Sequence, residues 1–165
     1  VKGMKLRSIL KEIIITLVLL FVISNIISYI SQPELGSTQL PKIEVELIDG
    51  TLFKHQEGKP LVLHFWAIGC PACKLEAPNI EIISKEYEVL SISLNSGSDE
   101  KIKAYLKENE LSFRVVNDSN GEWAKKFKIE VYPTTFIYDA KGELRFTEVG
   151  YTTTAGLLAR MEWIE

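Results

Sequence analysis

Cysteine is scarce in this chain, because only Cys70 and Cys73 occur among its 165 residues. A fold held together by disulfides uses several cysteine pairs, and a structural zinc site usually takes four ligands. The chain has one pair, and its two histidines, His55 and His64, are not spaced as metal ligands. A bridge that closes so short a loop would also restrict the unfolded chain little. The scarcity therefore favours a redox-active pair.

Positive charge is limited and unevenly placed. The net charge is −3, yet residues 1–12 carry a net +3 and residues 13–30 carry none, which leaves −6 on the remainder. A domain that binds nucleic acid usually carries a basic face that neutralises phosphates. An acidic domain without a basic stripe argues against a nucleic-acid partner.

The longest apolar run lies near the beginning of the sequence. Residues 13–30 are almost all Ile, Leu, Val and Phe, and this length is close to the roughly 20 residues that cross a bilayer. Basic residues precede the run and none follows it closely, so the positive-inside rule places residues 1–12 in the cytoplasm. A cleaved signal peptide is the alternative, but its apolar core is usually only about 7–15 residues. We predict one membrane anchor at 13–30, a linker at 31–41, and a folded domain at 42–165 in the periplasm or another extracytoplasmic space.

The two cysteines lie where a strand meets a helix. The apolar run 61–66 is typical of a buried strand, and a helical pattern begins near Pro71. The first amides of a helix have no partner within it and carry partial positive charge, which stabilises a thiolate. We therefore expect a lowered pKa at Cys70, whose exposed sulfur would attack, with Cys73 one turn later as the resolving thiol.

Strand and helix patterns alternate through the folded domain. Strands are predicted at 43–47, 51–53, 61–66, 89–94, 113–116, 134–138 and 144–149. Helices are predicted at 71–87, from Ser98, at 120–127, and from Thr153 or Thr154. Because the pattern ends in an antiparallel hairpin, it predicts an α/β domain with a mixed central β-sheet flanked by helices.

Four segments together resemble the thioredoxin superfamily. They are Phe65-Trp66-Ala67, Cys70-Pro71-Ala72-Cys73-Lys74, Glu76-Ala77-Pro78 and Val131-Tyr132-Pro133-Thr134-Thr135-Phe136-Ile137. In this order they are similar to the membrane-tethered TlpA-, ResA- and DsbE-like thiol–disulfide oxidoreductases, including suppressor-for-copper-sensitivity D proteins. The resemblance covers residues 42–165 and implies a thioredoxin-like fold.

The resemblance also implies roles for residues around the pair. It implies a cis peptide bond before Pro133, facing the disulfide, and a Tyr132 backbone that pairs with an extended substrate. Pro71 and Ala72, which lie between the cysteines, would contact the substrate together with Tyr132 and Pro133.

Glu76 and His64 are candidates for moving a proton at the site. In the TlpA-like group a glutamate one turn after the second cysteine lies near the pair, so a buried Glu76 would exchange a proton with Cys73. An exposed carboxylate near a helix start is the alternative. His64 stands where thioredoxins carry a buried acid, and it is either a proton relay or a packed core residue. His55 is expected to face solvent.

These features predict an enzyme that exchanges disulfides with protein substrates and uses no cofactor or metal. We favour the reducing direction, which requires electrons from a membrane partner because the outside compartment is oxidising. The resemblance suggests a DsbD- or CcdA-type donor, with substrates in cytochrome c maturation or envelope copper stress. Two alternatives remain: a copper-binding or copper-delivery module that uses both thiols, and a peroxiredoxin-type peroxidase, although Ala67 stands where such a peroxidase has threonine.

Overall fold

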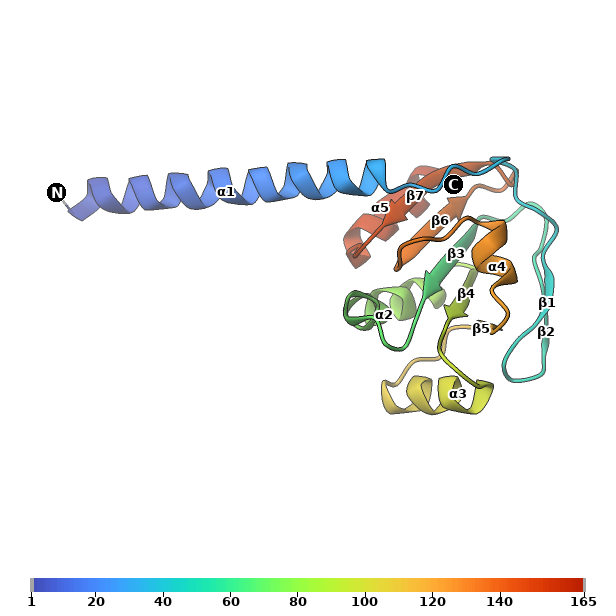
Figure 1. Ribbon diagram of the computed structural model, residues 1–165. Coiled ribbons are helices and arrows are strands. Elements are labelled where there is room, and N and C mark those ends of the chain that lie inside the picture. Colours follow the sequence, from blue (N-terminus) through green and yellow to red (C-terminus); the bar gives the residue numbers. More distant parts are fainter. Residues whose placement is uncertain (1, 165) are drawn as a thin grey trace. The chain divides into compact units, whose positions relative to one another are not determined.

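The computed structural model describes residues 2–164, and the contacts within the chain divide it after Gln32 into two units. The first unit contains helix α1, Lys2–Ile30, which is one continuous helix (Figure 1). Its apolar segment Arg7–Ile30 has 24 residues. At about 1.5 Å per residue, this segment is long enough to span the hydrocarbon core of a bilayer. The structure therefore contains a helix that could serve as the predicted anchor.

The second unit begins at Pro33 and is built on a five-stranded sheet. The strand order is β5-β4-β3-β6-β7. The bounds are β3 Leu61–Trp66, β4 Val89–Leu94, β5 Val115–Asp118, β6 Thr134–Tyr138 and β7 Leu144–Val149. Strands β3, β4 and β5 are parallel, whereas β6 pairs antiparallel with β3, and β7 antiparallel with β6. The predicted mixed sheet is confirmed.

A short hairpin precedes this sheet in the chain. Strand β1, Glu44–Glu46, pairs antiparallel with β2, Leu52–Lys54. The turn between them is closed by Asp49, whose Oδ1 accepts hydrogen bonds from the amide and the hydroxyl of Thr51 at 2.9 and 2.6 Å. This hairpin also agrees with the sequence prediction.

Helices cover both faces of the five-stranded sheet (Figure 1). One core receives side chains from α2 Pro71–Ser84, α3 Asp99–Glu108 and α5 Thr154–Ile164. The opposite core contains Phe127, which follows α4 Glu122–Lys126. Successive residues of a strand face opposite sides of a sheet. His64 therefore lies on the same face of β3 as Val62 and Trp66, which belong to the core beneath α2.

The segment that precedes the hairpin pairs with the turn before β7. The amide of Leu144 donates to the carbonyl of Thr38 at 2.8 Å, and the amide of Leu40 donates to the carbonyl of Gly142 at 2.7 Å. Gln39 and Glu143 form an isolated antiparallel bridge between these two bonds. The folded unit therefore already includes the last residues of the stretch predicted as a linker.

Candidate active site

The two cysteines lie at the carboxyl end of β3, where the chain turns into α2. Cys70 is the residue that precedes the first helical turn, and Pro71 occupies the first helical position, where a missing amide proton costs nothing. The amide of Cys70 donates to the carbonyl of Ala67 at 3.2 Å, which closes the turn between strand and helix. The sulfurs of Cys70 and Cys73 are joined in a disulfide, and their Cα atoms are 5.2 Å apart.

The amino end of α2 is directed at the first sulfur of the pair. The amide of Cys73 donates a hydrogen bond to Sγ of Cys70 at 3.0 Å. Cys70 keeps 8% of its surface exposed, whereas Cys73 keeps 1%. Both cysteines are largely buried, and Cys70 is the more accessible of the two. This agrees with the prediction that Cys70 is the cysteine that a substrate can reach. The amide contact is the arrangement that stabilises a thiolate at this position in the reduced protein.

The loop before β6 forms the other side of the site. The peptide bond between Tyr132 and Pro133 is cis, as the resemblance implies. The carbonyl oxygen of Tyr132 lies 3.6 Å from Sγ of Cys70. Val131, just before it, is exposed, and Tyr132 is half-buried. The loop therefore faces the disulfide as the resemblance implies, although Tyr132 and Cys70 are 62 positions apart in the sequence.

Beneath the disulfide, His64 and Glu76 come together in the protein interior. Glu76 has no exposed surface and His64 has 1%, so the alternative of an exposed Glu76 carboxylate is wrong. Nδ1 of His64 lies 3.8 Å from Oε2 of Glu76 and 3.0 Å from Oγ1 of Thr135. The other carboxyl oxygen of Glu76, Oε1, accepts the amide of Thr152 at 2.7 Å.

Burial keeps both groups of this pair neutral around neutral pH. It lowers the pKa of His64 to about 3 because the imidazolium would lose its hydration. It raises the pKa of Glu76 to about 8, and the nearby charge of Glu148 adds to the rise, while hydrogen bonds from Thr152 oppose it. The contact is therefore between a carboxylic acid and a neutral imidazole.

The sequence analysis overlooked three residues of this buried region. They are Thr135, which binds His64, Thr152, which holds Glu76, and Glu148, the register partner of Thr135 on β7. Two threonines at the start of the buried strand β6, Thr134 and Thr135, were a usable signal. No local signal pointed to Thr152, because its amide meets Glu76 only through the tertiary fold.

The prediction that His55 faces solvent is wrong. Its Nδ1 lies 2.9 Å from Oε1 of Glu88, and the two side chains are only 10% and 13% exposed. His55 lies at the other end of the sheet from the redox pair, because Glu88 directly precedes β4, which runs parallel to β3, whereas the pair follows the carboxyl end of β3. Among residues 2–164, no group of three or more His, Cys, Asp or Glu side chains is arranged to hold a metal ion.

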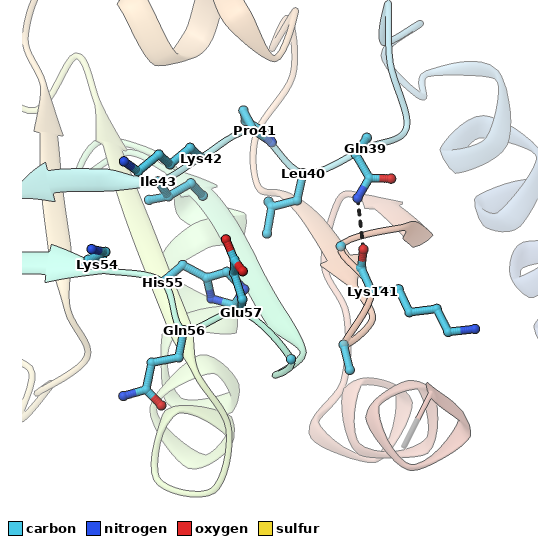
Figure 2. A pocket seen from close by; sticks show the side chains of 13 residues that line it. Gln39, Leu40, Pro41, Lys42, Ile43, Lys54, His55, Gln56, Glu57 and Lys141 are labelled. Atoms are coloured by element: carbon cyan, nitrogen blue, oxygen red, sulfur yellow. Dashed lines mark hydrogen bonds between the residues drawn. The ribbon is translucent and has the colours of Figure 1, made fainter.

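A separate cleft of about 950 Å³ lies at the other end of the sheet. It is lined by residues 39–43, 54–58 and 140–142, and in Figure 2 the amide of Gln39 reaches across to Lys141. Gly58, at its rim, comes shortly before the start of β3, whereas the disulfide follows the end of this six-residue strand. At about 3.3 Å per residue, the strand separates the two places by roughly 16 to 20 Å. The cleft is therefore not part of the disulfide site.

Comparison with known proteins gives a consistent picture. The sequence model of the AhpC/TSA family matches residues 37–147. A thioredoxin-like protein of Haemophilus influenzae is 31% identical over 166 aligned positions, which cover 98% of this chain and 98% of that protein. Sporulation thiol-disulfide oxidoreductase A of Bacillus subtilis is 34% identical, covering 66% of this chain and 68% of that protein. The crystal structure of StoA from Bacillus subtilis matches with a TM-score of 0.66 and 28% identity over 78% of this chain and 100% of that chain.

Proposed function

Because the chain belongs to the AhpC/TSA family and is a thiol–disulfide oxidoreductase of the ResA and StoA type, we propose that it is anchored in a membrane and reduces disulfides of proteins outside the cytoplasm. One observation carries the proposal. Sγ of Cys70 lies between the amide of Cys73 and the carbonyl of Tyr132, at 3.0 and 3.6 Å. A helix end that stabilises a thiolate thus faces a loop whose backbone can align an extended chain.

The exchange proceeds through two attacks of sulfur on sulfur. The Cys70 thiolate attacks one sulfur of a substrate disulfide, and the other substrate sulfur leaves as a thiolate and takes a proton. Cys73 then loses its proton and attacks Sγ of Cys70, which forms the intramolecular disulfide and releases the second substrate thiolate. Overall the substrate gains two electrons and two protons, and the two enzyme thiols become the disulfide that the structure contains.

The backbone around the pair is proposed to hold the substrate during these steps. The half-buried Tyr132 and the buried Pro133 would align the substrate strand, with the Tyr132 backbone supplying hydrogen bonds. Pro71 is exposed and Ala72 is half-buried, so both can contact the residues that flank the substrate cysteine.

Glu76 is proposed to take the proton of Cys73, from one helical turn away. Burial raises its pKa to about 8, which is near enough to neutrality for both protonation states to be populated. His64 would assist as a proton relay, because it is the ionisable side chain whose nitrogen lies 3.8 Å from the Glu76 carboxyl.

The membrane arrangement is proposed from the apolar helix and the charges before it. Residues 13–30 would anchor the protein, residues 1–12 would stay in the cytoplasm, and residues 31–41 would lead to the catalytic domain. An oxidising compartment cannot re-reduce the Cys70–Cys73 disulfide, so a membrane electron donor of the DsbD or CcdA type is proposed as a partner. Protein substrates would belong to cytochrome c maturation or to the response of the envelope to copper stress.

Trapping of the mixed disulfide tests the mechanism. The Cys73→Ser variant of the full chain, reduced and mixed with insulin, should accumulate an adduct that reducing agent releases. The Cys70→Ser variant keeps one thiol and serves as the matched control, and it should form no comparable adduct. Equal trapping by the two variants, or trapping by neither, would overturn the assignment of Cys70 as the attacking sulfur.

The reduction potential of the pair tests the direction. A value near that of thioredoxin, about −270 mV, would support a reductant, whereas a value near about −120 mV is that of a strong oxidant such as DsbA. The potential follows from equilibration of the protein with defined ratios of reduced and oxidised glutathione. An oxidising value would overturn the reducing role while leaving the exchange chemistry in place.

A further inference from the structure

A row of polar side chains crosses the sheet beneath the disulfide. His64 on β3 is the register partner of Ser91 on β4 and of Thr135 on β6, and Thr135 is the register partner of Glu148 on β7. Register partners on neighbouring strands point to the same face of a sheet. The row therefore lies on the face of the sheet that carries α2, below Glu76.

The inner end of the row is fixed in a defined geometry. Oε1 of Glu76 is held by the amide of Thr152, which leaves Oε2 on the side of His64. Within residues 2–164, Oε2 is buried and has no hydrogen-bond partner. Nδ1 of His64 lies between this oxygen, at 3.8 Å, and the hydroxyl of Thr135, at 3.0 Å. One nitrogen thus connects the carboxyl group to the next member of the row.

The outer end of the row reaches the protein surface. The side chain of Glu148 is 20% exposed, and its Oε1 lies 2.6 Å from Nε of Arg160 on α5. The charge of Glu148 also contributes to the raised pKa of Glu76, after the larger effect of burial. The Glu148 carboxylate therefore acts electrostatically on the Glu76 carboxyl group. Glu148 is in contact with water, whereas Glu76 is fully buried.

We propose that His64, Thr135 and Glu148 form a proton path that connects buried Glu76 to solvent at β7, away from the surface that a substrate covers at Cys70. The inference deepens the proposed function and depends on it. In the mixed disulfide, substrate occupies the accessible side of Cys70, while Cys73 and Glu76 are buried. A proton on Glu76 then needs a second exit before Glu76 can accept the proton of Cys73.

The steps of the path conserve atoms and charge. Oε2 of Glu76 gives its proton to Nδ1 of the neutral His64 ring, and the short-lived imidazolium passes this same proton from Nδ1 to the hydroxyl oxygen of Thr135. Thr135 in turn gives its own hydroxyl proton to Glu148, which releases a proton to water. Cys73 then transfers its proton to the Glu76 carboxylate, and its thiolate forms the S–S bond with Cys70 while the substrate thiolate leaves.

The charged and titratable groups that act on Glu76 come from each neighbouring element. His64 faces it from β3, and Glu148 acts on it from β7 with its charge partly balanced by Arg160 of α5. Cys73 precedes it on α2. Ser91 lies on the other side of His64, away from β7, and its buried hydroxyl has no hydrogen-bond partner within residues 2–164. Ser91 is thus next to His64 but does not lie between Glu76 and the solvent-exposed end of the path at Glu148.

The test follows decay of the mixed disulfide between the reduced full-length protein and insulin, by acid quench and mass spectrometry. It is run at pH values below and above the pKa of Glu76, about 8. Thr135→Val should slow decay by at least about tenfold below this pKa, because a positioned proton transfer is worth roughly 10²–10⁴ in rate. Above it the difference should vanish, because Glu76 has already lost its proton. Ser91→Ala, which removes a hydroxyl beside His64 but off the path, should match the wild type.

Glu148→Gln provides a second variant, at a side chain that is 20% exposed and that keeps an oxygen for Arg160. It should slow decay below the pKa in the same way, and it should also move the pH profile to lower pH because a neighbouring negative charge is removed. Wild-type decay rates in both Thr135→Val and Glu148→Gln, or slowing that is equal at all pH values, would overturn the path while the trapping experiment still stands. Failure of the wild type to form any adduct with insulin would instead overturn the proposed function.

Discussion

Nδ1 of His64 lies 3.8 Å from Oε2 of Glu76, yet this contact is not an ion pair at neutral pH. Burial lowers the pKa of His64 to about 3 and raises that of Glu76 to about 8, so both side chains are uncharged between these values. Two neutral groups are far cheaper to bury than two charges. The protein thus keeps an ionisable carboxyl beneath its disulfide, at the expense of stability at high pH.

The first prediction concerns the pH dependence of the free energy of unfolding. The pKa of Glu76 in the folded protein, about 8, is above its ordinary value of 4.5, so its contribution is fully present below pH 4.5 and lost as pH rises through 8. The loss is at most about 1.4 kcal/mol per pH unit. Glu76→Gln should remove it, as measured by guanidinium unfolding of the oxidised protein at several pH values.

The difference in unfolding free energy between the wild type and Glu76→Gln reports the contribution of Glu76 without that of His64. The lowered pKa of His64 acts in the opposite sense, because its contribution is lost as pH falls from 6.5 towards 3. This contribution is common to both proteins and cancels in the difference. A difference in unfolding free energy that stays constant from pH 5 to 9 would contradict a buried, protonated Glu76.

Local patterns in the sequence were enough to predict an α/β domain with a mixed sheet and the redox pair, whereas the thioredoxin-like fold was implied by the family resemblance. The apolar stretches 61–66 and 134–138 coincide with β3 and β6. The Cys-x-x-Cys pair lies at the start of α2, as the proline at the first helical position indicated. Where local propensity and tertiary packing agree, the sequence is a sufficient guide.

The predictions that failed depend on partners distant in sequence. The strand predicted from Phe113 begins at Val115, because the amide of Phe113 donates to Glu81 at 3.1 Å instead of joining the sheet. The helix predicted to reach residue 87 ends at Ser84. His55 turns inward because Glu88, 33 residues later, accepts its hydrogen bond. None of these partners is visible in a local pattern.

Glu81 is predicted to tie α2 to the segment before β5. Its carboxylate accepts the amides of Ser112 and Phe113 at 2.7 and 3.1 Å, together with the Ser112 hydroxyl. Burial alone would raise its pKa, but these hydrogen bonds outweigh burial and lower it. Glu81→Ala should reduce the free energy of unfolding by about 1–3 kcal/mol, because a buried amide loses its acceptor.

The effect of Glu81→Ala should also depend on pH. A lowered folded-state pKa means that the stabilisation is present above pH 4.5 and lost as pH falls through the folded value, so wild type and variant should converge in acid. Lys85→Ala removes only the exposed partner that lies 3.7 Å from Glu81, and it should change stability little. Denaturant titrations at neutral and acidic pH would measure both, and equal losses in the two variants would be incompatible with this role.

Asp118 is predicted to hold the start of α4. Its two carboxyl oxygens accept the amides of Trp123 and Ala124 at 3.0 and 2.8 Å, and Gly121, at the helix start, has no side chain to do so. Asp118→Ala should lower the free energy of unfolding by about 1–2 kcal/mol, the usual effect of removing a capping side chain. The control Glu122→Ala removes an exposed acid from the first turn and should have less than half this effect. Thermal or denaturant unfolding distinguishes the two.

Gly142 is predicted to fix the segment 38–40 to the folded domain. Its φ of +74° is unfavourable for a side chain, and an added Cβ would lie 2.8 Å from Nε2 of Gln39. Gly142→Ala should displace the Gln39 amide from its hydrogen bond to the carbonyl of Lys141 and loosen the pairing of Leu40. Faster hydrogen exchange at the Leu40 amide would report this loosening.

The control for this variant is Gly50→Ala, which has the same backbone problem without the clash. Gly50 has a φ of +84°, but nothing lies within 4 Å of the position where its Cβ would be. Both variants should lose roughly 1 kcal/mol of stability through the positive φ, whereas only Gly142→Ala should accelerate exchange at Leu40 relative to the rest of the sheet. If the Leu40 amide is equally protected in the two variants, the contact with Gln39 does not hold segment 38–40 in place. The hydrogen bonds of Leu40 and Leu144 would then suffice, because both use backbone atoms that an alanine at residue 142 leaves intact.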